Sequence, residues 1–214
     1  MLLETRAAAP FFKNGYLLGC QITGEAIVID PGDEIPEILD LVASRKLTVK
    51  YILLTHAHMD HVSGVARLRT ATGAPIGLHQ EDLFLYDRAV EQGKMFGYAV
   101  DPPPPPDFFY DTAGAPLVFG HHHVRVLHTP GHSPGGVCLR VGVAGQPGLD
   151  LFAGDTLFAN SIGRTDLPGG NLKTLLHAIR TQLFALDDAT IVYPGHGPET
   201  TIGEERRNNP FLQA

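Results

Sequence analysis

Short apolar runs alternate with polar turns and with amphipathic segments along the whole chain. Runs that end at turn residues predict a β-hairpin over 11–30 and further strands at 49–54, 76–79, 137–143, 149–153 and 190–193. Apolar positions at helical spacing predict helices over 34–46, 62–73, 81–92 and 171–183. The repeated order of strand and helix indicates a layered α/β fold.

Composition and charge limit the class of protein. The 214 residues, of which 43% are hydrophobic, suffice for a sizeable core, so we expect residues 1–214 to form a single domain. A net charge of −7 without any run of Lys or Arg argues against nucleic-acid binding. No segment resembles a signal peptide or a membrane span, so we expect a soluble cytoplasmic protein. Cys20 and Cys138, inside apolar segments, are expected to be buried free thiols.

Candidate chemistry concentrates in Thr55–His61, directly after an apolar strand. His56, His58, Asp60 and His61 supply three imidazoles and a carboxylate, the usual ligands of zinc and related metals. In an extended loop, the first three would point one way and His61 the other, so one segment could serve two adjacent metal ions. Uncompensated polar groups after a buried strand would be costly, which argues against a purely structural role.

The spelling H-x-H-x-D-H resembles the metal motif of the metallo-β-lactamase-fold hydrolases. This resemblance requires three further ligands downstream. They are present as His132 in a Gly-bounded turn, Asp155 after an apolar strand and His196 after a late strand. The match runs over nearly the whole chain and implies an α/β protein with a four-layer αβ/βα sandwich, the metallo-β-lactamase fold.

The same resemblance implies a role for each ligand. A first divalent metal ion would be held by His56, His58 and His132, a second by Asp60, His61 and His196, and Asp155 would bridge the two. We expect zinc, although iron or manganese suits the same donors. A hydroxide that bridges the two ions would be the nucleophile, oriented by Asp60. The ions would also polarise the substrate carbonyl and stabilise its oxyanion.

Segments around the ligands indicate a substrate class. An aspartate at position 60 is similar to the thioesterase, lactonase and nuclease branches rather than to true β-lactamases, and the acidic chain lacks the basic surface of the nucleases. The segments Gly154–Phe158, Gly163–Asp166 and Asn209–Phe211 resemble the hydroxyacylglutathione hydrolases (glyoxalase II), in particular their short bacterial form. The implied substrate is a small-molecule thioester, with S-2-hydroxyacylglutathione as the expected example.

The sequence departs from the longer glyoxalase II enzymes in two respects. It ends 18 residues after His196, without their C-terminal helical domain, and it lacks the lysine and tyrosine that they place after the bridging Asp. Arg164 is the nearest cationic substitute, and it either anchors a substrate carboxylate or braces its own loop. Thioester hydrolysis is therefore better supported than glutathione as the carrier.

Other activities of the same fold stay open. A persulfide dioxygenase would use one iron ion, held here by His56, His132 and Asp155, and it shares the Gly163–Asp166 loop pattern. A lactonase would apply the two-metal apparatus to an acyl-homoserine lactone. A non-catalytic binding module is disfavoured because none of the seven ligands is missing.

Several other polar segments have both a structural and a functional interpretation, and we favour the structural one for each. Asp30 caps its turn or takes part in catalysis. The five prolines at 102–106, with the aromatic residues after them, form a rigid connector or a lid. We expect a solvated turn at His121–His123 rather than a metal clamp, and packing roles for His79 and His128.

Overall fold

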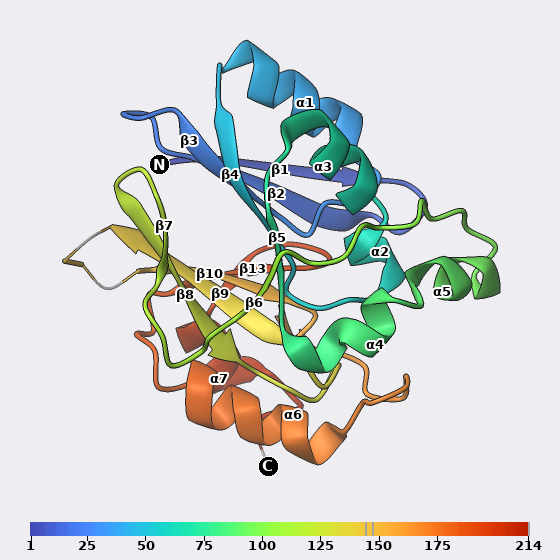
Figure 1. The fold of residues 1–214 in the computed structure, drawn as a ribbon. Helices are drawn as coiled ribbons and strands as arrows, with labels where there is room; N and C mark the ends of the chain where they lie inside the picture. The colour runs from blue at the N-terminus through green and yellow to red at the C-terminus, as the bar shows by residue number, and fades with distance from the viewer. Residues whose placement is uncertain (144, 147, 214) are drawn as a thin grey trace. The chain divides into compact units, whose positions relative to one another are not determined.

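The computed structural model describes residues 1–143, 145–146 and 148–213. The chain groups into two compact units, and Figure 1 traces the elements of both. Unit 1 comprises Met1–Tyr110 and Val118–His121, and unit 2 comprises Asp111–Leu117 and the chain from His122 onward. That residues 1–214 form a single domain stays a prediction.

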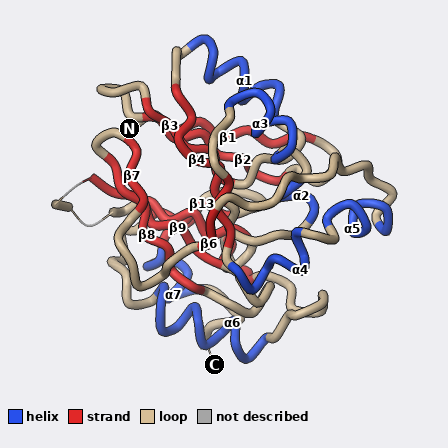
Figure 2. Tube along the Cα trace, in the orientation of Figure 1, coloured by secondary structure: helices blue, strands red, loops and turns tan. Residues whose placement is uncertain are grey.

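Every residue of unit 1 is described, and the unit contains a six-stranded sheet (strands are red in Figure 2). Its strands follow the order of the sequence: β1 (Leu2–Ala8), β2 (Lys13–Gly19), β3 (Glu25–Ile29), β4 (Thr48–Leu53), β5 (Ile76–Leu78) and β6 (Phe108–Phe109). The first three strands are antiparallel neighbours, whereas β3 to β6 run parallel. The predicted hairpin is confirmed as β2 and β3. Strand β1 was not predicted, because its side chains are half-buried or exposed and form no apolar run.

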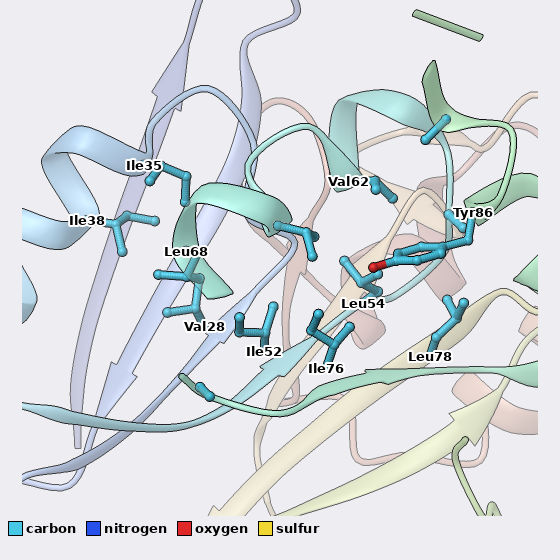
Figure 3. Close-up of a cluster of buried hydrophobic side chains, with 14 of the residues drawn as sticks. Val28, Ile35, Ile38, Ile52, Leu54, Val62, Leu68, Ile76, Leu78 and Tyr86 are labelled. Carbon is cyan, nitrogen blue, oxygen red and sulfur yellow. The ribbon is translucent and has the colours of Figure 1, made fainter. Parts of the chain in front are cut away.

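Helices pack on one face of this sheet. They are α1 (Ile35–Ser44), α2 (Met59–Val62), α3 (Val65–Thr72), α4 (Leu83–Tyr86) and α5 (Ala89–Met95). Figure 3 shows Ile35 and Ile38 of α1 and Leu68 of α3 beside the strand residues Val28 and Ile52, all buried in one apolar cluster. The predictions of helices at 34–46 and 62–73 are confirmed, the second as α2 and α3.

The single helix predicted over 81–92 is wrong. This segment forms a 3₁₀ turn at Gln80–Asp82 and then the separate helices α4 and α5. The carboxylate of Asp82 is fully buried and accepts a hydrogen bond from the backbone N–H of Ala57 at 3.0 Å. This tertiary contact holds the first turn in place, and the local apolar spacing carries no information about it.

The proline segment is extended and tied to unit 1 at several points. The Tyr86 hydroxyl donates to the Pro104 carbonyl at 2.7 Å, and the Asp107 carboxylate accepts from the backbone N–H of Ile76 at 2.8 Å. After β6, the buried Tyr110 hydroxyl lies 3.0 Å and 2.9 Å from the carbonyl oxygens of Leu54 and Gly77. These contacts favour the connector interpretation over the lid.

The described part of unit 2 contains a second sheet. Its hydrogen-bonded order is β14 (Thr200–Thr201), β13 (Ile191–Pro194), β10 (Asp150–Gly154), β9 (Val137–Val143) and β8 (His122–His128). Only β10 and β13 are parallel neighbours among these pairs. The short strands β11 (Leu157–Phe158) and β12 (Ser161–Ile162) form a separate ribbon, and β7 (Leu117–Phe119) crosses the boundary between the units. The predicted strands at 137–143, 149–153 and 190–193 are confirmed.

Two helical segments cover the apolar core of unit 2. They are α6 (Leu172–Ala178), which continues as a π-helical turn at Ile179–Leu183, and α7 (Ile202–Asn208). Asn171 caps α6, since its side chain accepts a hydrogen bond from the backbone N–H of Thr174 at 3.0 Å. Leu175, Ile179 and Leu183 are buried as the apolar stripe predicts, but Leu172 is exposed.

The predicted solvated turn at His121–His123 is wrong for its last two residues, which begin β8. His121 is exposed and His122 is buried, because the turn ends at His121, two residues before the run of histidines ends.

Both cysteines are buried free thiols, as predicted. Burial raises the pKa of the Cys138 thiol to about 11. Burial acts in the same direction on Cys20. The Cys20 thiol, however, accepts hydrogen bonds from the Thr23 hydroxyl and from backbone N–H groups, including that of His121. These hydrogen bonds outweigh the effect of burial and lower the pKa of Cys20 to about 6.

Candidate metal-binding site

The four predicted ligands of unit 1 follow β4 within one short segment. His58 has an extended backbone and is the N-cap of α2, so Asp60 and His61 lie in a helical turn. The expectation of one extended loop is therefore wrong from Met59 onward. A helical turn places Asp60 near the helix N-terminus, where a carboxylate is favourable.

These four side chains are close together and largely withdrawn from solvent. The ring centroids of His56 and His61 are 4.0 Å apart, and those of His56 and His58 are 4.9 Å apart. The Nε2 atom of His61 lies 3.7 Å from the Oδ2 atom of Asp60. The three histidines are buried, and Asp60 is partly exposed. Unit 1 thus contributes a compact group of three imidazoles and a carboxylate.

Asp30 supports this group from the end of β3. Its carboxylate accepts hydrogen bonds from the Thr55 backbone N–H at 2.7 Å and from the Thr55 hydroxyl at 2.6 Å. It also lies 3.0 Å from Nδ1 of His61. A carboxylate behind the imidazole orients the ring and raises its basicity as a metal ligand. These contacts favour the structural interpretation of Asp30 over direct catalysis.

The turn that carries Asp30 is held by a buried ion pair. Lys13 and Glu34 are both almost fully buried, and the Lys13 ammonium lies 2.9 Å from the Glu34 carboxylate. Lys13 also donates to the Asp30 carbonyl, and Glu34 accepts from the Gly32 backbone N–H at 2.7 Å. The sequence analysis missed this pair. A lysine inside a strand was the only signal for it.

The three predicted ligands of unit 2 also lie together. The Nε2 atoms of His132 and His196 are 3.6 Å and 3.8 Å from the Oδ2 atom of Asp155. Nδ1 of His132 lies 2.7 Å from the Arg164 carbonyl oxygen. A carbonyl oxygen only accepts, so Nδ1 carries the proton and the Nε2 lone pair is available to a metal ion.

Glycines allow the backbone of this group to approach closely. Gly131, directly before His132, has a φ of 137°, and a Cβ there would fall 2.3 Å from the Leu175 nitrogen. A Cβ at Gly163 would fall 1.9 Å from the Asp155 carbonyl oxygen. Only glycine fits either position, so the turn that carries His132 packs on α6 and the loop that carries Arg164 packs on Asp155.

The Arg164 side chain forms a two-point ion pair within its own loop. Its Nε and Nη2 atoms donate to the two carboxylate oxygens of Asp166 at 2.7 Å and 2.8 Å. The hydrogen bond from Arg164 is the main cause that lowers the pKa of Asp166 to about 2. This geometry favours the brace over the substrate anchor, and the anchor stays a prediction.

The remaining histidines have the expected local contacts. Nδ1 of His79 accepts from the Glu81 backbone N–H at 3.3 Å, and Nε2 of His128 lies 2.9 Å from the Pro134 carbonyl oxygen. These local contacts support the packing roles predicted for both histidines. With seven side chains of metal-binding type in two compact groups at strand ends, the chain has the features of a metal-binding α/β protein.

The chain belongs to the metallo-β-lactamase superfamily, whose family model matches residues 8–196. It is 38% identical over 190 residues to the hydroxyacylglutathione hydrolase GloC of Haemophilus influenzae, and the match covers 88% of each chain. Two solved structures are similar over nearly their whole length. The BLEG-1 B3 metallo-β-lactamase has 37% identity and a TM-score of 0.88, with both chains covered to 100%. TTHA1623 in a di-iron-bound form has 40% identity and a TM-score of 0.85, with 98% of this chain and 100% of that chain covered.

These comparisons confirm the metallo-β-lactamase fold and the resemblance to the short hydroxyacylglutathione hydrolases, and they identify the chain as a metallo-hydrolase. No helix in the described part of the chain has both the length and the apolarity to cross a lipid bilayer. The individual ligand roles and the cytoplasmic location stay predictions.

Replacement of Lys13 by Met should destabilise the turn behind Asp30. The change leaves the Glu34 carboxylate buried without its cation, so we expect the free energy of unfolding to fall by about 3–5 kcal/mol. Urea denaturation followed by circular dichroism measures this change. Lys50→Met is the matched control, because Lys50 and Glu25 form a partly exposed pair at 3.3 Å, and its loss should cost less than about 1 kcal/mol. Equal losses in the two variants would contradict the bracing role of Lys13.

Proposed function

We propose that this protein hydrolyses small acyl thioesters and that S-2-hydroxyacylglutathione is among its substrates. One observation carries the proposal: the chain keeps all seven potential ligands and is 38% identical to a hydroxyacylglutathione hydrolase over 88% of both chains. The match covers 88% of the length of GloC, so the similarity extends over most of a protein named for this activity.

Two divalent metal ions, which we expect to be zinc, would be held by His56, His58 and His132, by Asp60, His61 and His196, and by Asp155 as a shared ligand. The donor set fits, since imidazole and carboxylate are the groups that zinc, iron and manganese accept. When bound, the ions would supply a water molecule ionised near neutral pH and would polarise the thioester carbonyl.

The protein's own side chains would position the reacting groups. The Arg164 carbonyl keeps His132 in the tautomer that presents Nε2, and the Asp30 carboxylate lies 3.0 Å from Nδ1 of His61. Asp60, partly exposed beside His61, would accept a hydrogen bond from the attacking water and so fix its orientation. No serine or cysteine nucleophile is needed, and the buried Cys138 stays protonated because its pKa is about 11.

Hydrolysis of a β-lactam ring is the second candidate. The BLEG-1 B3 metallo-β-lactamase is similar over its whole length at 37% identity, close to the identity with GloC. Both reactions are attacks on an acyl carbon, so the same ligands would serve either one. The choice depends on the residues that contact the rest of the substrate.

A substrate panel tests the proposed function. We expect kcat/KM for S-lactoylglutathione to exceed the values for benzylpenicillin and an acyl-homoserine lactone by about tenfold or more, because substrates of one fold differ in transition-state binding outside the reacting bond. Thiol release and loss of lactam absorbance provide the assays. Removal of metal with a chelator should abolish turnover, and readdition should restore it. Faster turnover of the penicillin or of the lactone would contradict the thioesterase proposal.

The metal content of the purified protein distinguishes hydrolysis from oxidation. We expect two divalent ions per chain by elemental analysis, since the seven ligands suffice for two ions with a shared carboxylate. The di-iron-bound form of the similar protein TTHA1623 supports two ions per chain. One iron ion per chain together with oxygen consumption on glutathione persulfide would support the dioxygenase instead.

Asp60→Asn tests the positioning of the attacking water. An amide keeps the shape of the carboxylate but weakens its acceptance of hydrogen bonds, so we expect kcat to fall by about 10²–10⁴-fold with little change in the unfolding midpoint. Metal content is measured in parallel, because Asp60 is also a proposed ligand. Asp87→Asn is the control at an exposed aspartate and should leave kcat unchanged. An unchanged kcat in the Asp60 variant would remove this role.

A further inference from the structure

A second polar cluster lies in unit 2, away from the strand ends that lead to His132 and Asp155. It involves the beginning of β8 and the end of β9, which lie side by side (Figure 1). The described residues that line it are His123, Arg125, Arg140, Gly145, Gln146 and Gly148, around a concavity of about 250 Å³. We call this concavity the distal basic site. None of its lining residues belongs to the predicted ligand set.

The two arginines of the distal basic site face each other directly. Arg125 and Arg140 are paired across the antiparallel strands β8 and β9, and both line the same concavity. Like charges at directly opposed positions of a sheet are destabilising, because their Cβ atoms are only about 4.5–5.5 Å apart. An anion between the two guanidinium groups removes this repulsion.

The protein provides no carboxylate for this purpose among its described residues. Elsewhere in the acidic chain, arginines face acidic side chains, as Arg69 does with Asp107 at 2.9 Å. Arg125 has no ion pair or hydrogen bond to any described residue, and no Asp or Glu lines the concavity. Arg140 donates through Nε to the Gly148 carbonyl at 2.8 Å. Its two terminal amino groups make no hydrogen bond to the described protein.

Close packing of Gly148 on β9 forms one wall of the site. A Cβ at Gly142 would fall 2.7 Å from the Gly148 Cα atom, and a Cβ at Gly148 would fall 2.1 Å from the Val141 carbonyl oxygen. Glycine at both positions lets Gly148 lie directly on the strand. The Arg140 hydrogen bond to Gly148 then fixes the guanidinium against this wall.

We propose that the distal basic site binds the phosphoryl group of a small soluble molecule. Two guanidinium groups match the geometry of a tetrahedral dianion through paired N–H donors. The Gln146 amide and the His123 imidazole add further donors beside them. The concavity is smaller than the roughly 300–1,000 Å³ of sites for drug-sized ligands, which favours a small ligand. The net charge of −7 disfavours a polyanion such as a nucleic acid.

Titration of the metal-loaded protein with inorganic phosphate at constant ionic strength tests this proposal. We expect saturable binding of one phosphate per chain at this site by calorimetry. Arg125→Gln and Arg140→Gln should each weaken it by about tenfold or more, because each removes a charge-assisted donor pair. Arg125→Lys should also weaken it, since an ammonium group keeps the charge but loses the paired donors. Arg88→Gln, at an exposed arginine in unit 1, removes the same charge and should leave binding unchanged.

Further measurements distinguish phosphate binding at the distal basic site from phosphate binding elsewhere on the protein. Asp155→Asn, at a proposed metal ligand, should retain phosphate binding. Loss in that variant with retention in Arg125→Gln would place the phosphate at the metal ions and overturn the proposal. An equal loss in Arg88→Gln would show a general charge effect and also overturn it. Sedimentation with phosphatidic acid vesicles in the absence of any response to free phosphate would indicate a lipid headgroup and reject the small soluble ligand.

Discussion

The buried carboxylate of Asp30 is the contact on which the ligand group of unit 1 depends. It accepts two hydrogen bonds from Thr55 and lies 3.0 Å from His61, so it joins the carboxyl ends of the parallel strands β3 and β4. A carboxylate that is only 1% exposed requires such partners, because an unpaired charge at this depth would be strongly destabilising. The need to satisfy Asp30 therefore fixes the direction of the segment that follows β4. Lys13 and Glu34 extend the same network by holding the turn around Asp30.

The ligand group of unit 2 is held in place by backbone contacts rather than by side-chain contacts. His132 is oriented by a carbonyl oxygen, and its turn packs against α6 at a glycine that tolerates no Cβ. A backbone acceptor orients an imidazole as firmly as a carboxylate does, and it does so without a buried charge. The two ligand groups thus depend on different kinds of residues. The first depends on charged residues far apart in sequence, and the second depends on glycines at fixed positions.

These differences explain how much could be predicted from the sequence. The ligand group of unit 1 carries an explicit motif directly after an apolar strand, so it followed from local pattern. The ligand group of unit 2 followed from the family resemblance, which implied His132, Asp155 and His196. The strands and α6 followed from their periodicity. Lys13 and Glu34 are 21 positions apart, and Asp82 contacts Ala57 at a separation of 25 positions, so no local sequence pattern predicts either contact. The second of these contacts lies in the 3₁₀ turn with which the segment predicted as one helix over 81–92 begins. Strand β1 was not predicted, because an edge strand with half-buried side chains has no apolar run.

The choice of substrate depends on a different part of the molecule from the metal ligands. Metal ions and a positioned water act on any activated acyl carbon, so the ligand set is compatible with thioesters, lactones and lactams alike. The identities with GloC and with BLEG-1 differ by a single percentage point, although the two proteins are named for different substrates. Overall similarity therefore favours neither activity over the other. Discrimination must come from loop side chains that contact the leaving group. Arg164 is the one cation that the sequence suggested for this purpose, and its guanidinium is paired with Asp166. A substrate carboxylate could bind Arg164 only by displacing that partner, so any contribution from Arg164 would be the difference between two similar ion pairs at an exposed position and therefore small.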